Sequence, residues 1–306
     1  MKETTITVPA TSANLGPGFD CLGLALNLYN QVIFTETDDS ELTITVCGEG
    51  TSQIPTDKRN LVYQAADCTF AQIGRRPSGF RITQNNCIPV GSGLGSSSAA
   101  TISGILGANA LVDGGLSQAQ ILALAVEIEG HPDNATPALY GGLTLTLTED
   151  KQLYVEHISI PTLKVVIVLP DFDFPTIQSR ATLPQHISRQ DAIFNIGRMG
   201  LLISALTTAD HSKLRLAMQD RLHQPYRFPL IPGSEDVIHA AYGEGATAVA
   251  LSGAGPSLIA FAPHNHQAIS QAMQQGFAQV GLSSQTWLLE TTTHGATITQ
   301  KTKSPV

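Results

Sequence analysis

The sequence has little charge, few cysteines and no long hydrophobic run. Only 14% of its 306 residues are Asp, Glu, Lys or Arg, and the formal net charge is −8. With 42% hydrophobic residues, this composition is typical of compact folded domains and excludes an intrinsically disordered chain. Basic residues form no cluster larger than Lys58–Arg59 or Arg75–Arg76, so the broad basic surface of a nucleic-acid-binding protein is not expected.

Other absent patterns restrict the cellular location that we expect and the kinds of site that the chain could form. The four cysteines are far apart without a CxxC pair, and the nine histidines show no HExxH spacing, so neither disulfides nor a zinc site are predicted. No run reaches the roughly 18 apolar residues of a transmembrane helix, and residues 165–169, for example, have the length of a strand. Residues 1–7 lack the apolar segment of a signal peptide. We therefore expect a cytoplasmic protein with no membrane partner.

The segment PVGSGLGSSSA at residues 89–99 is the most informative part of the chain. Three glycines and four serines lie between Gly91 and Ser98. A strand-like segment precedes them at residues 79–88, and a helix-like segment follows at residues 98–111. Strand, glycine loop and helix together present backbone N–H groups and the positive end of a helix dipole to an anion. The pattern favours a phosphate-binding loop, with a tight turn before a closely packed helix as the alternative.

Better-known loops do not match this segment. No lysine occurs between Lys58 and Lys151, which excludes the P-loop pattern GxxxxGK[ST]. Ser96 stands where the dinucleotide-binding pattern GxGxxG needs its third glycine. None of the loop serines has both glycines of the nucleophile elbow GxSxG.

Three further segments complete an ordered set of motifs. They are VPATSANLGPGFDCLGLA at residues 8–25, GHPDNATPALYGG at residues 130–142 and LSGAGPSL at residues 251–258. In this order, with the glycine loop between the first two, they resemble the GHMP small-molecule kinases, a family that includes galactokinase, homoserine kinase, mevalonate kinase and phosphomevalonate kinase. The resemblance extends from residue 4 to about residue 262. SANLGPGFD and HPDN resemble the homoserine branch, and Thr11 and Ser12 stand near the place where mevalonate-type members carry a lysine.

The resemblance implies an α+β fold of two domains. Residues 1–160 would form an ATP-binding domain of the ribosomal protein S5 type, and residues 161–306 a ferredoxin-like βαββαβ domain. Apolar periodicity agrees with this order. Strands are expected at residues 4–8, 22–35, 42–46, 143–157 (as a hairpin), 164–169, 247–251, 257–261 and 286–290, and helices at 60–73, 98–111, 117–128 and 265–279, with two more opening at Ser188 and Ser212. The last dozen residues are expected to be a loosely held tail.

Phosphoryl transfer from ATP needs a phosphate cradle, a divalent ion and a positioned acceptor hydroxyl. In the family, a serine of the glycine loop and a glutamate before the middle motif bind Mg²⁺. Ser97 matches the serine best; Glu127 is the preferred glutamate and Glu129 the alternative, while a solvated helix face is the other interpretation of either. Asn60 matches a position near the adenine, or else is simply a helix N-cap. The residues implied to contact ATP are Asn60, Pro89, Val90, Gly91, Ser92, Gly93, Leu94, Gly95, Ser96, Ser97, Ser98 and Ala99.

An amino-acid acceptor carries two charges, so its pocket needs an anion for the ammonium and a cation for the carboxylate. Asp20, in the turn GPGFD, resembles the ammonium partner, with Asn14 beside it. Arg180 and Arg227 match the arginines expected at the carboxylate, which a guanidinium can bind through two parallel hydrogen bonds. Arg180 is also expected to take part in catalysis.

The middle motif supplies the residues expected beside the transferred phosphate. In mevalonate-type relatives the aspartate of this motif acts as a general base, whereas in the homoserine branch Asn134 is the expected contact of the hydroxyl. Base catalysis by Asp133 is left open, because a loose transition state makes little demand on deprotonation of the nucleophile. His131 is interpreted as a structural loop residue. Residues 252–257 form a second glycine loop that is expected to pack against the first from the other domain.

The resemblance therefore implies an ATP- and Mg²⁺-dependent transfer of phosphate to the hydroxyl of L-homoserine, giving O-phospho-L-homoserine on the way to threonine. The alternatives are a kinase of the same family with another alcohol substrate, a nucleotide-binding sensor without activity, and a structural α+β protein. The sensor would be favoured by loss of the glutamate or of the loop serines, and neither is lost. The expected partner is a small-molecule substrate, and a homodimer is left open.

Overall fold

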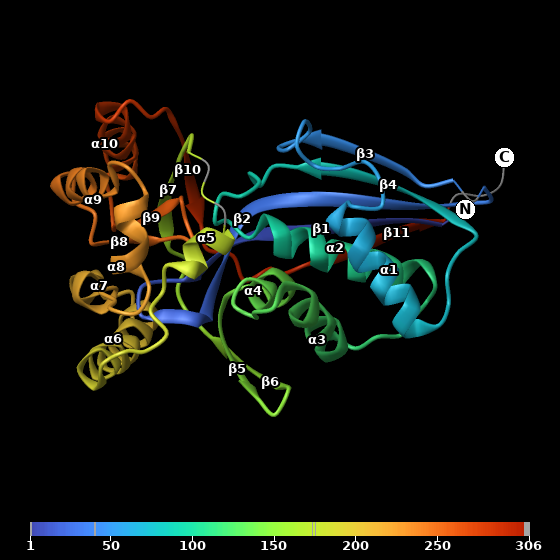
Figure 1. Cartoon of the computed structure of the whole chain (residues 1–306), viewed down its shortest axis with the longest axis horizontal. Coiled ribbons are helices and arrows are strands. Elements are labelled where there is room, and N and C mark those ends of the chain that lie inside the picture. The colour runs from blue at the N-terminus through green and yellow to red at the C-terminus, as the bar shows by residue number, and fades with distance from the viewer. Residues whose placement is uncertain (1, 40, 173, 175, 303–306) are drawn as a thin grey trace.

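The computed structural model describes residues 2–39, 41–172, 174 and 176–302, which form two lobes side by side (Figure 1). The larger lobe is built mainly from the first half of the chain. In chain order its elements are β1 (Lys2–Asn14), β2 (Gly18–Thr37), β3 (Thr43–Gly48), α1 (Leu61–Ile73), β4 (Gly79–Asn86), α2 (Ser96–Leu111), α3 (Gln118–Glu129), α4 (Ala135–Tyr140), β5 (Leu143–Glu149) and β6 (Gln152–Ile158).

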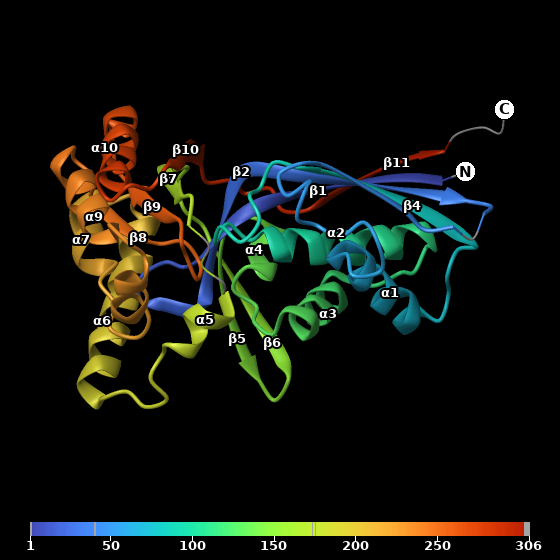
Figure 2. The same ribbon diagram turned by 45° about the horizontal axis from the view of Figure 1, so that its top comes forward.

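A twisted sheet forms one layer of this lobe, and helices cover one of its faces (Figure 2). Within the described residues its strand order is β11-β1-β2-β4-β3, with β5 paired to β2 and β6 to β5. The long antiparallel pair β1–β2 is its centre, and its register shifts between Pro9 and Ala10 and between Ala13 and Asn14. The second shift lies next to the turn that carries several predicted site residues.

Local sequence explains where these helices begin and end. Asn60 caps α1, and its side-chain oxygen accepts from two backbone N–H groups. Ser117 and Gln120 form a capping box at α3, which ends at Gly130 in a left-handed conformation. α2 is rich in Gly and Ala because it is buried on nearly all sides; a Cβ at Gly107, for example, would collide with the ring of Phe34.

The smaller lobe comprises β7 (Lys164–Pro170), α5 (Thr176–Ala181), α6 (Arg189–Thr207), α7 (His211–Ala217), α8 (Gln224–Arg227), α9 (Ser234–Gly243), β8 (Ala248–Leu251), β9 (Leu258–Phe261), α10 (His266–Gln279) and β10 (Ser284–Glu290). Its antiparallel strands have the order β10-β7-β9-β8. This is the ferredoxin-like arrangement, with α5 to α9 between its first two strands. The predicted α+β fold of two parts is thereby confirmed.

The two faces of the smaller sheet pack into different cores. Val165, Ile167 and Ile259 belong to a core that continues into the larger lobe. Val166 and Leu258 face the other way and pack with side chains of α9 and α10. Because strand residues alternate between faces, a single short strand contributes to both cores.

The end of the chain returns to the larger lobe. β11 (Thr297–Thr302) pairs antiparallel with β1, and Ile298 lies opposite Ile6. The expectation of a loose tail is therefore wrong for residues 297–302, while residues 303–306 lie outside the described residues. A domain boundary at residue 160 would fall between β6 and β7. Because β11 follows that boundary in the sequence but belongs to the first sheet, we propose the boundary for every strand except β11. Among the described residues, no helix is long and apolar enough to cross a membrane.

Candidate active site

The glycine loop leads from β4 into the N-terminus of α2. Gly91, Gly93 and Gly95 have φ angles of 66°, 81° and 72°, a backbone conformation that costs glycine little. A Cβ at Gly95 would collide with Thr11 Oγ1, and one at Gly93 with the carbonyl oxygen of Ser252. The loop is therefore pressed against β1 on one side and against the second glycine loop on the other.

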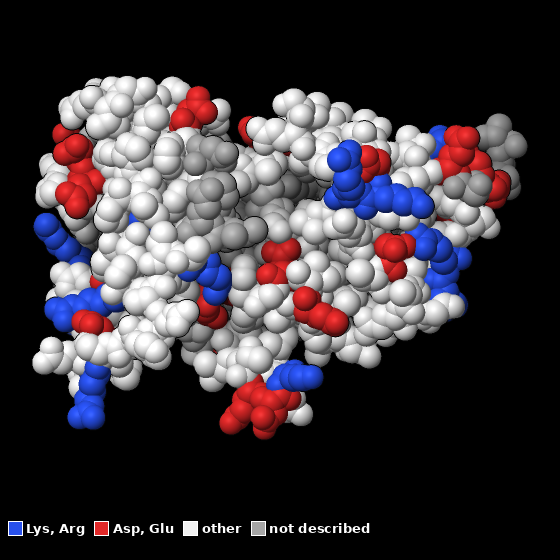
Figure 3. Space-filling model, viewed as in Figure 1, with Lys and Arg blue, Asp and Glu red and all other residues white. Residues whose placement is uncertain are grey.

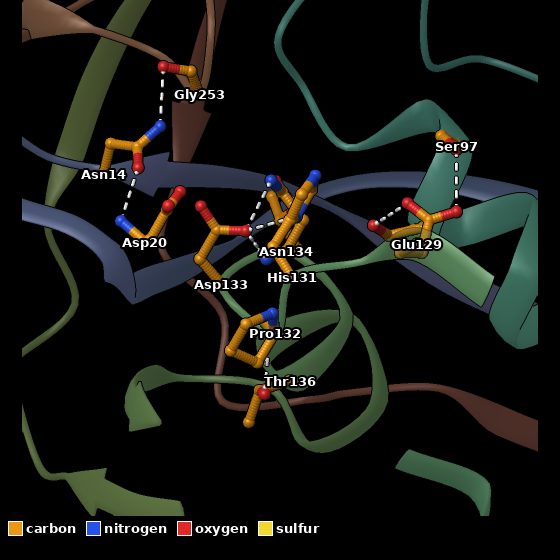
Figure 4. Close-up of polar contacts among 12 residues, drawn as sticks. Asn14, Asp20, Ser97, Glu129, His131, Pro132, Asp133, Asn134, Thr136 and Gly253 are labelled. Carbon is orange, nitrogen blue, oxygen red and sulfur yellow. Dashed lines mark hydrogen bonds and ion pairs between the residues drawn. The ribbon is translucent and has the colours of Figure 1, made fainter. Parts of the chain in front are cut away.

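A cavity of about 350 Å³ lies in front of this loop and is lined by both lobes. The molecular surface is hollowed between the lobes, with acidic and basic side chains beside the hollow (Figure 3). Figure 4 shows several residues of the site, among them Asn14 and Glu129. The predicted site residues that line the cavity are Asn14, Gly91, Ser92, Gly93, Gly95, Ser96, Ser97, Ser98, Asp133, Asn134, Arg180 and Arg227.

The second glycine loop contacts the first, as the sequence predicted. Ser252 Oγ lies 2.8 Å from the carbonyl oxygen of Gly93 and 2.9 Å from Ser12 Oγ. Ser257 N donates to the carbonyl oxygen of Ser92 at 3.2 Å. The side chain of Asn14 donates to the carbonyl oxygen of Gly253 at 2.8 Å, so the same segment also holds the β1–β2 turn (Figure 4).

A second cavity of about 260 Å³ adjoins the loop on the side of α1. Val90, Ser96 and Ala99 line it, and so does Asn60. The Asn60 side chain is wholly buried and caps α1, and it also accepts from Gln84 Nε2 at 2.8 Å. Its observed role is thus that of a cap in the wall of this cavity.

Some predicted loop residues serve packing. Leu94 and Ala99 are wholly buried, and Leu94 lines neither cavity. Ser92 Oγ donates to the carbonyl oxygen of Pro89 at 2.8 Å, which closes the turn. A ligand in front of the loop would therefore meet its glycines and the later serines.

Glu129, and not Glu127, lies against the loop serines. Ser97 Oγ donates to Glu129 Oε1 at 2.8 Å (Figure 4). Ser98 Oγ donates to Glu129 Oε2 at 2.9 Å. Thr101 Oγ1 donates to Oε1 at 2.7 Å. Two residues correspond to about 200° of rotation on a helix, so Glu127 faces the other way and is exposed. The geometry therefore favours Glu129, the alternative, over Glu127 as the carboxylate beside the loop serines, and the metal ligand itself stays a prediction.

The middle motif places a buried carboxylate in the wall of the cavity. Asp133 is 2% exposed, and its Oδ1 lies 2.9 Å from His131 Nδ1 and accepts from Asn134 N at 2.9 Å. This hydrogen bond raises the pKa of His131, although burial opposes the shift. Asn134 Oδ1 accepts from Thr11 Oγ1 at 2.8 Å, which fixes the orientation of the amide.

Asp20 and Arg180 form a two-point ion pair beside the cavity. Arg180 Nη1 and Nη2 donate to the Asp20 carboxylate at 2.9 and 2.8 Å. Asp20 has a φ of 57°, and its backbone N–H donates to Asn14 Oδ1 at 2.9 Å. The turn thus holds the carboxylate in place, and the pair connects the turn to α5.

Arg227 is buried with part of its hydrogen-bonding capacity unused. It is 1% exposed, and its guanidinium lies over the ring of Phe19 at 5.3 Å. Nη1 lies 3.2 Å from His223 Nδ1 and 3.4 Å from the carbonyl oxygen of Gly253, whereas Nε has no partner. Burial, together with the charge of Arg180, lowers the pKa of Arg227 to about 10, so the group stays cationic at neutral pH.

Comparison with known proteins now decides the family. The model described as "GHMP kinases N terminal domain" matches residues 60–142, and "GHMP kinases C terminal" matches residues 202–279. The chain belongs to the GHMP kinase family. A homoserine kinase of Moorella thermoacetica is 43% identical over 294 residues, covering 96% of this chain and 99% of that protein. A homoserine kinase of Caldicellulosiruptor bescii is 43% identical over 298 residues, covering 96% of each.

Solved structures agree with this placement among the GHMP kinases. The homoserine kinase from Cytophaga hutchinsonii has a TM-score of 0.87 at 32% identity, covering 97% of both chains. Mevalonate kinase from L. major, solved with R-mevalonate, has a TM-score of 0.71 at 16% identity and covers 93% of this chain and 94% of its own, which shows a shared fold. As a GHMP kinase, the chain is an ATP-dependent kinase of a small molecule.

Sequence reasoning missed four contributors to this GHMP kinase site. Thr11 orients Asn134 and Thr101 holds Glu129, while Phe19 and His223 contact Arg227. Thr101 could have been found, because it follows Ser97 by four residues on one helix. His223 precedes Arg227 by four residues and could have been found in the same way. Thr11 has no such signal, because its partner Asn134 is distant in sequence, and neither does Phe19, because Arg227 is distant from it.

Proposed function

We infer that this chain is a homoserine kinase, which transfers the γ-phosphate of ATP to the hydroxyl of L-homoserine and gives O-phospho-L-homoserine. One observation carries the choice of substrate: a wholly buried arginine with an unpartnered Nε–H lines the same cavity as the phosphate loop. A neutral sugar offers no anion for the buried charge of Arg227, whereas an amino-acid carboxylate does.

The donor half of the cavity fits ATP with Mg²⁺. We propose that the backbone of the glycine loop and the N-terminus of α2 hold the phosphates. Ser97 and Glu129 would hold Mg²⁺, with Ser98 and Thr101 orienting the carboxylate. One carboxylate with a hydroxyl fits Mg²⁺, which prefers oxygen ligands and keeps several waters. When bound, the ion would neutralise charge on the phosphates. The apolar second cavity beside Asn60 would take the adenine.

The acceptor half of the cavity suits a molecule that carries both a positive and a negative charge. The ammonium would bind Asp20 beside Asn14, and the carboxylate would bind Arg227 and Arg180. Asp20 and Arg180 neutralise one another in the structure, so a zwitterion can take up both partners as their mutual contact is broken. A ligand with one charge would leave one member of this pair uncompensated.

The hydroxyl would then lie beside the middle motif. We propose that Asn134, held by Thr11, contacts the hydroxyl and that Asp133 adds negative charge close by. Asp133 already accepts from His131 and from a backbone N–H, so its proposed part is to position the neighbouring groups. Positioning and charge stabilisation can carry most of the rate acceleration in phosphoryl transfer.

An assay of ADP release across acceptors tests this function. Homoserine should support far faster ADP release than mevalonate, shikimate or galactose at equal concentration. Preference for an acceptor without an amino group would refute the choice of homoserine and leave the kinase assignment standing. ADP release with none of them, together with tight ATP binding, would favour the nucleotide-binding sensor. The cytoplasmic location and a homodimer stay predictions.

A further inference from the structure

His223 is a buried neighbour of Arg227 that does not itself line the main cavity. Its side chain is 0% exposed and stacks on Phe19 with ring centroids 5.1 Å apart. Phe19 also lies under the guanidinium of Arg227. The ring is therefore part of the packing behind the proposed carboxylate site.

The hydrogen bonds of this ring define its tautomer. Nε2 lies 2.7 Å from the carbonyl oxygen of Gly16, which can only accept, so Nε2 carries the hydrogen. Nδ1 lies 3.2 Å from Arg227 Nη1, which can only donate, so Nδ1 carries the lone pair. Burial lowers the pKa of His223, in keeping with a neutral ring, while the charges around it, Asp220, Arg227 and Asp20, act in opposing directions.

Asp220 fixes the segment that carries both residues. Its carboxylate accepts from three successive backbone N–H groups, at residues 222–224, at 2.7 to 2.8 Å, and from Asn195 Nδ2 at 2.7 Å. The backbone N–H of Arg227 donates to the carbonyl oxygen of His223 at 3.2 Å, so the two residues lie one turn apart. These hydrogen bonds fix the backbone that carries the ring of His223 and the guanidinium of Arg227.

We propose that His223 is a positioning residue for the phosphoryl acceptor. Through Nδ1 it holds the guanidinium of Arg227, and through Nε2–H it holds Gly16 in the β1–β2 turn, which also carries Asn14 and Asp20. The ring thus sets the spacing between the groups that receive the carboxylate and the ammonium. This inference rests on the proposed homoserine kinase function.

Two substitutions separate the hydrogen bonds of the ring. In His223→Asn the side-chain oxygen can replace Nδ1 and accept from Arg227. In His223→Gln the amide can reach Gly16 but leaves no acceptor at the Nδ1 position. We expect His223→Gln to lower homoserine kcat/KM by about ten- to a hundredfold, with the KM for ATP changed less than about twofold, because one hydrogen bond to a charged group is lost. His223→Asn should recover most of that loss.

A double-variant cycle tests whether the effect passes through Arg227. In an Arg227→Met background, His223→Gln should cause little further loss of homoserine kcat/KM, because the hydrogen bond is already gone. An equal loss in both backgrounds would overturn the proposal. So would a parallel rise in the KM for ATP, since a purely structural role would disturb both substrates.

A measurement on the unchanged protein completes the test and does not depend on the folding of any variant. Nitrogen NMR of protein labelled at histidine should show His223 as the neutral Nε2–H tautomer at neutral pH. An Nδ1–H tautomer or an imidazolium would overturn the proposal, because Nδ1 could not accept. Wild-type protein that is inactive on homoserine would remove the proposed function and this inference together. If the wild type phosphorylates homoserine and His223→Gln does so equally well, this inference alone would be overturned.

Discussion

At the scale of single residues, contacts distinguish between neighbours that the sequence pattern leaves equal. Glu127 and Glu129 both precede the middle motif, yet only the phase of α3 decides which one meets the loop serines. In the run of three serines, Ser97 and Ser98 both donate to the Glu129 carboxylate, each to a different oxygen. Residue type and spacing therefore predicted the motif, whereas the rotation of α3 determined which glutamate contacts the loop serines.

Substitution of the two glutamates tests the proposed metal site. Glu129→Gln should lower kcat by about a hundredfold or more and raise the Mg²⁺ concentration needed for half-maximal rate, because charge stabilisation by a bound metal is worth several kcal/mol. Glu127→Gln is the matched control and should leave both quantities nearly unchanged, since Glu127 is exposed. Kinetics over a series of Mg²⁺ concentrations measure the effect, and the reverse ranking would return the metal to Glu127.

The two arginines differ in burial and should differ in effect. Arg227→Met leaves a carboxylate without its buried partner, which costs roughly 2–5 kcal/mol and corresponds to a fall of roughly 30- to several-thousand-fold in homoserine kcat/KM. The Arg180 side chain is 45% exposed, so solvent screens its charge and Arg180→Met should cost less. The KM for ATP serves as the control for both. A larger loss in Arg180→Met would contradict the proposed order.

At the scale of elements, the sequence predicted long periodic segments and missed short ones. The caps Asn60, Ser117 and Ser188 were identified because their side chains bond to nearby backbone. The helix expected to open at Ser212 is capped two residues earlier, by Asp210, whose side chain accepts from the backbone N–H of Ser212 at 3.1 Å. α4, α5 and α8 have four to six residues each. Helices this short have little intrinsic stability and depend on tertiary contacts that no local pattern contains.

A pair of glycine substitutions tests how the phosphate loop is packed. Gly91 and Gly95 share a positive φ, but a Cβ at Gly91 would meet no atom within 4 Å, whereas one at Gly95 would collide with Thr11 Oγ1. Gly91→Ala should lower the free energy of unfolding by about 1–2 kcal/mol, the cost of the left-handed conformation. Gly95→Ala should cost more and also lower kcat, because Thr11 must move away from Asn134. Thermal unfolding and kcat measure both effects, and equal losses would show that the collision is relieved.

At the scale of the whole molecule, the sequence predicted the parts and not how they join. Alternating strands and helices were enough to predict the ferredoxin-like order. The shared core was not predictable, because the inward-facing side of β7 has the same apolar composition as its other side. The pairing of β11 was not predictable either, because its partner β1 lies at the opposite end of the sequence. The proposed acceptor site depends on this joining, since Asn14 and Asp20 come from the first lobe and Arg227 from the second.

Global stability should depend on pH through the buried His223. Burial lowers its pKa in the folded protein, whereas the unfolded chain has the ordinary value of 6.5. As the pH falls through that value, the unfolded chain takes up a proton that the folded ring does not bind, so the free energy of unfolding decreases. Above it, the ring is neutral in both states and contributes no pH dependence. Because the pKa of His131 is raised, that group acts in the opposite direction and must be separated experimentally.

Comparison of the wild type with His223→Gln isolates this contribution, because every other titrating group is common to the two proteins. Denaturant unfolding between about pH 7.5 and pH 5 should show the wild type losing stability more steeply toward acid, by at most about 1.4 kcal/mol per pH unit. The stability difference between the two proteins should therefore shrink as the pH falls. Parallel curves would mean that the folded ring titrates like the unfolded one. Such a ring would become an imidazolium in mild acid and could no longer accept from Arg227 there.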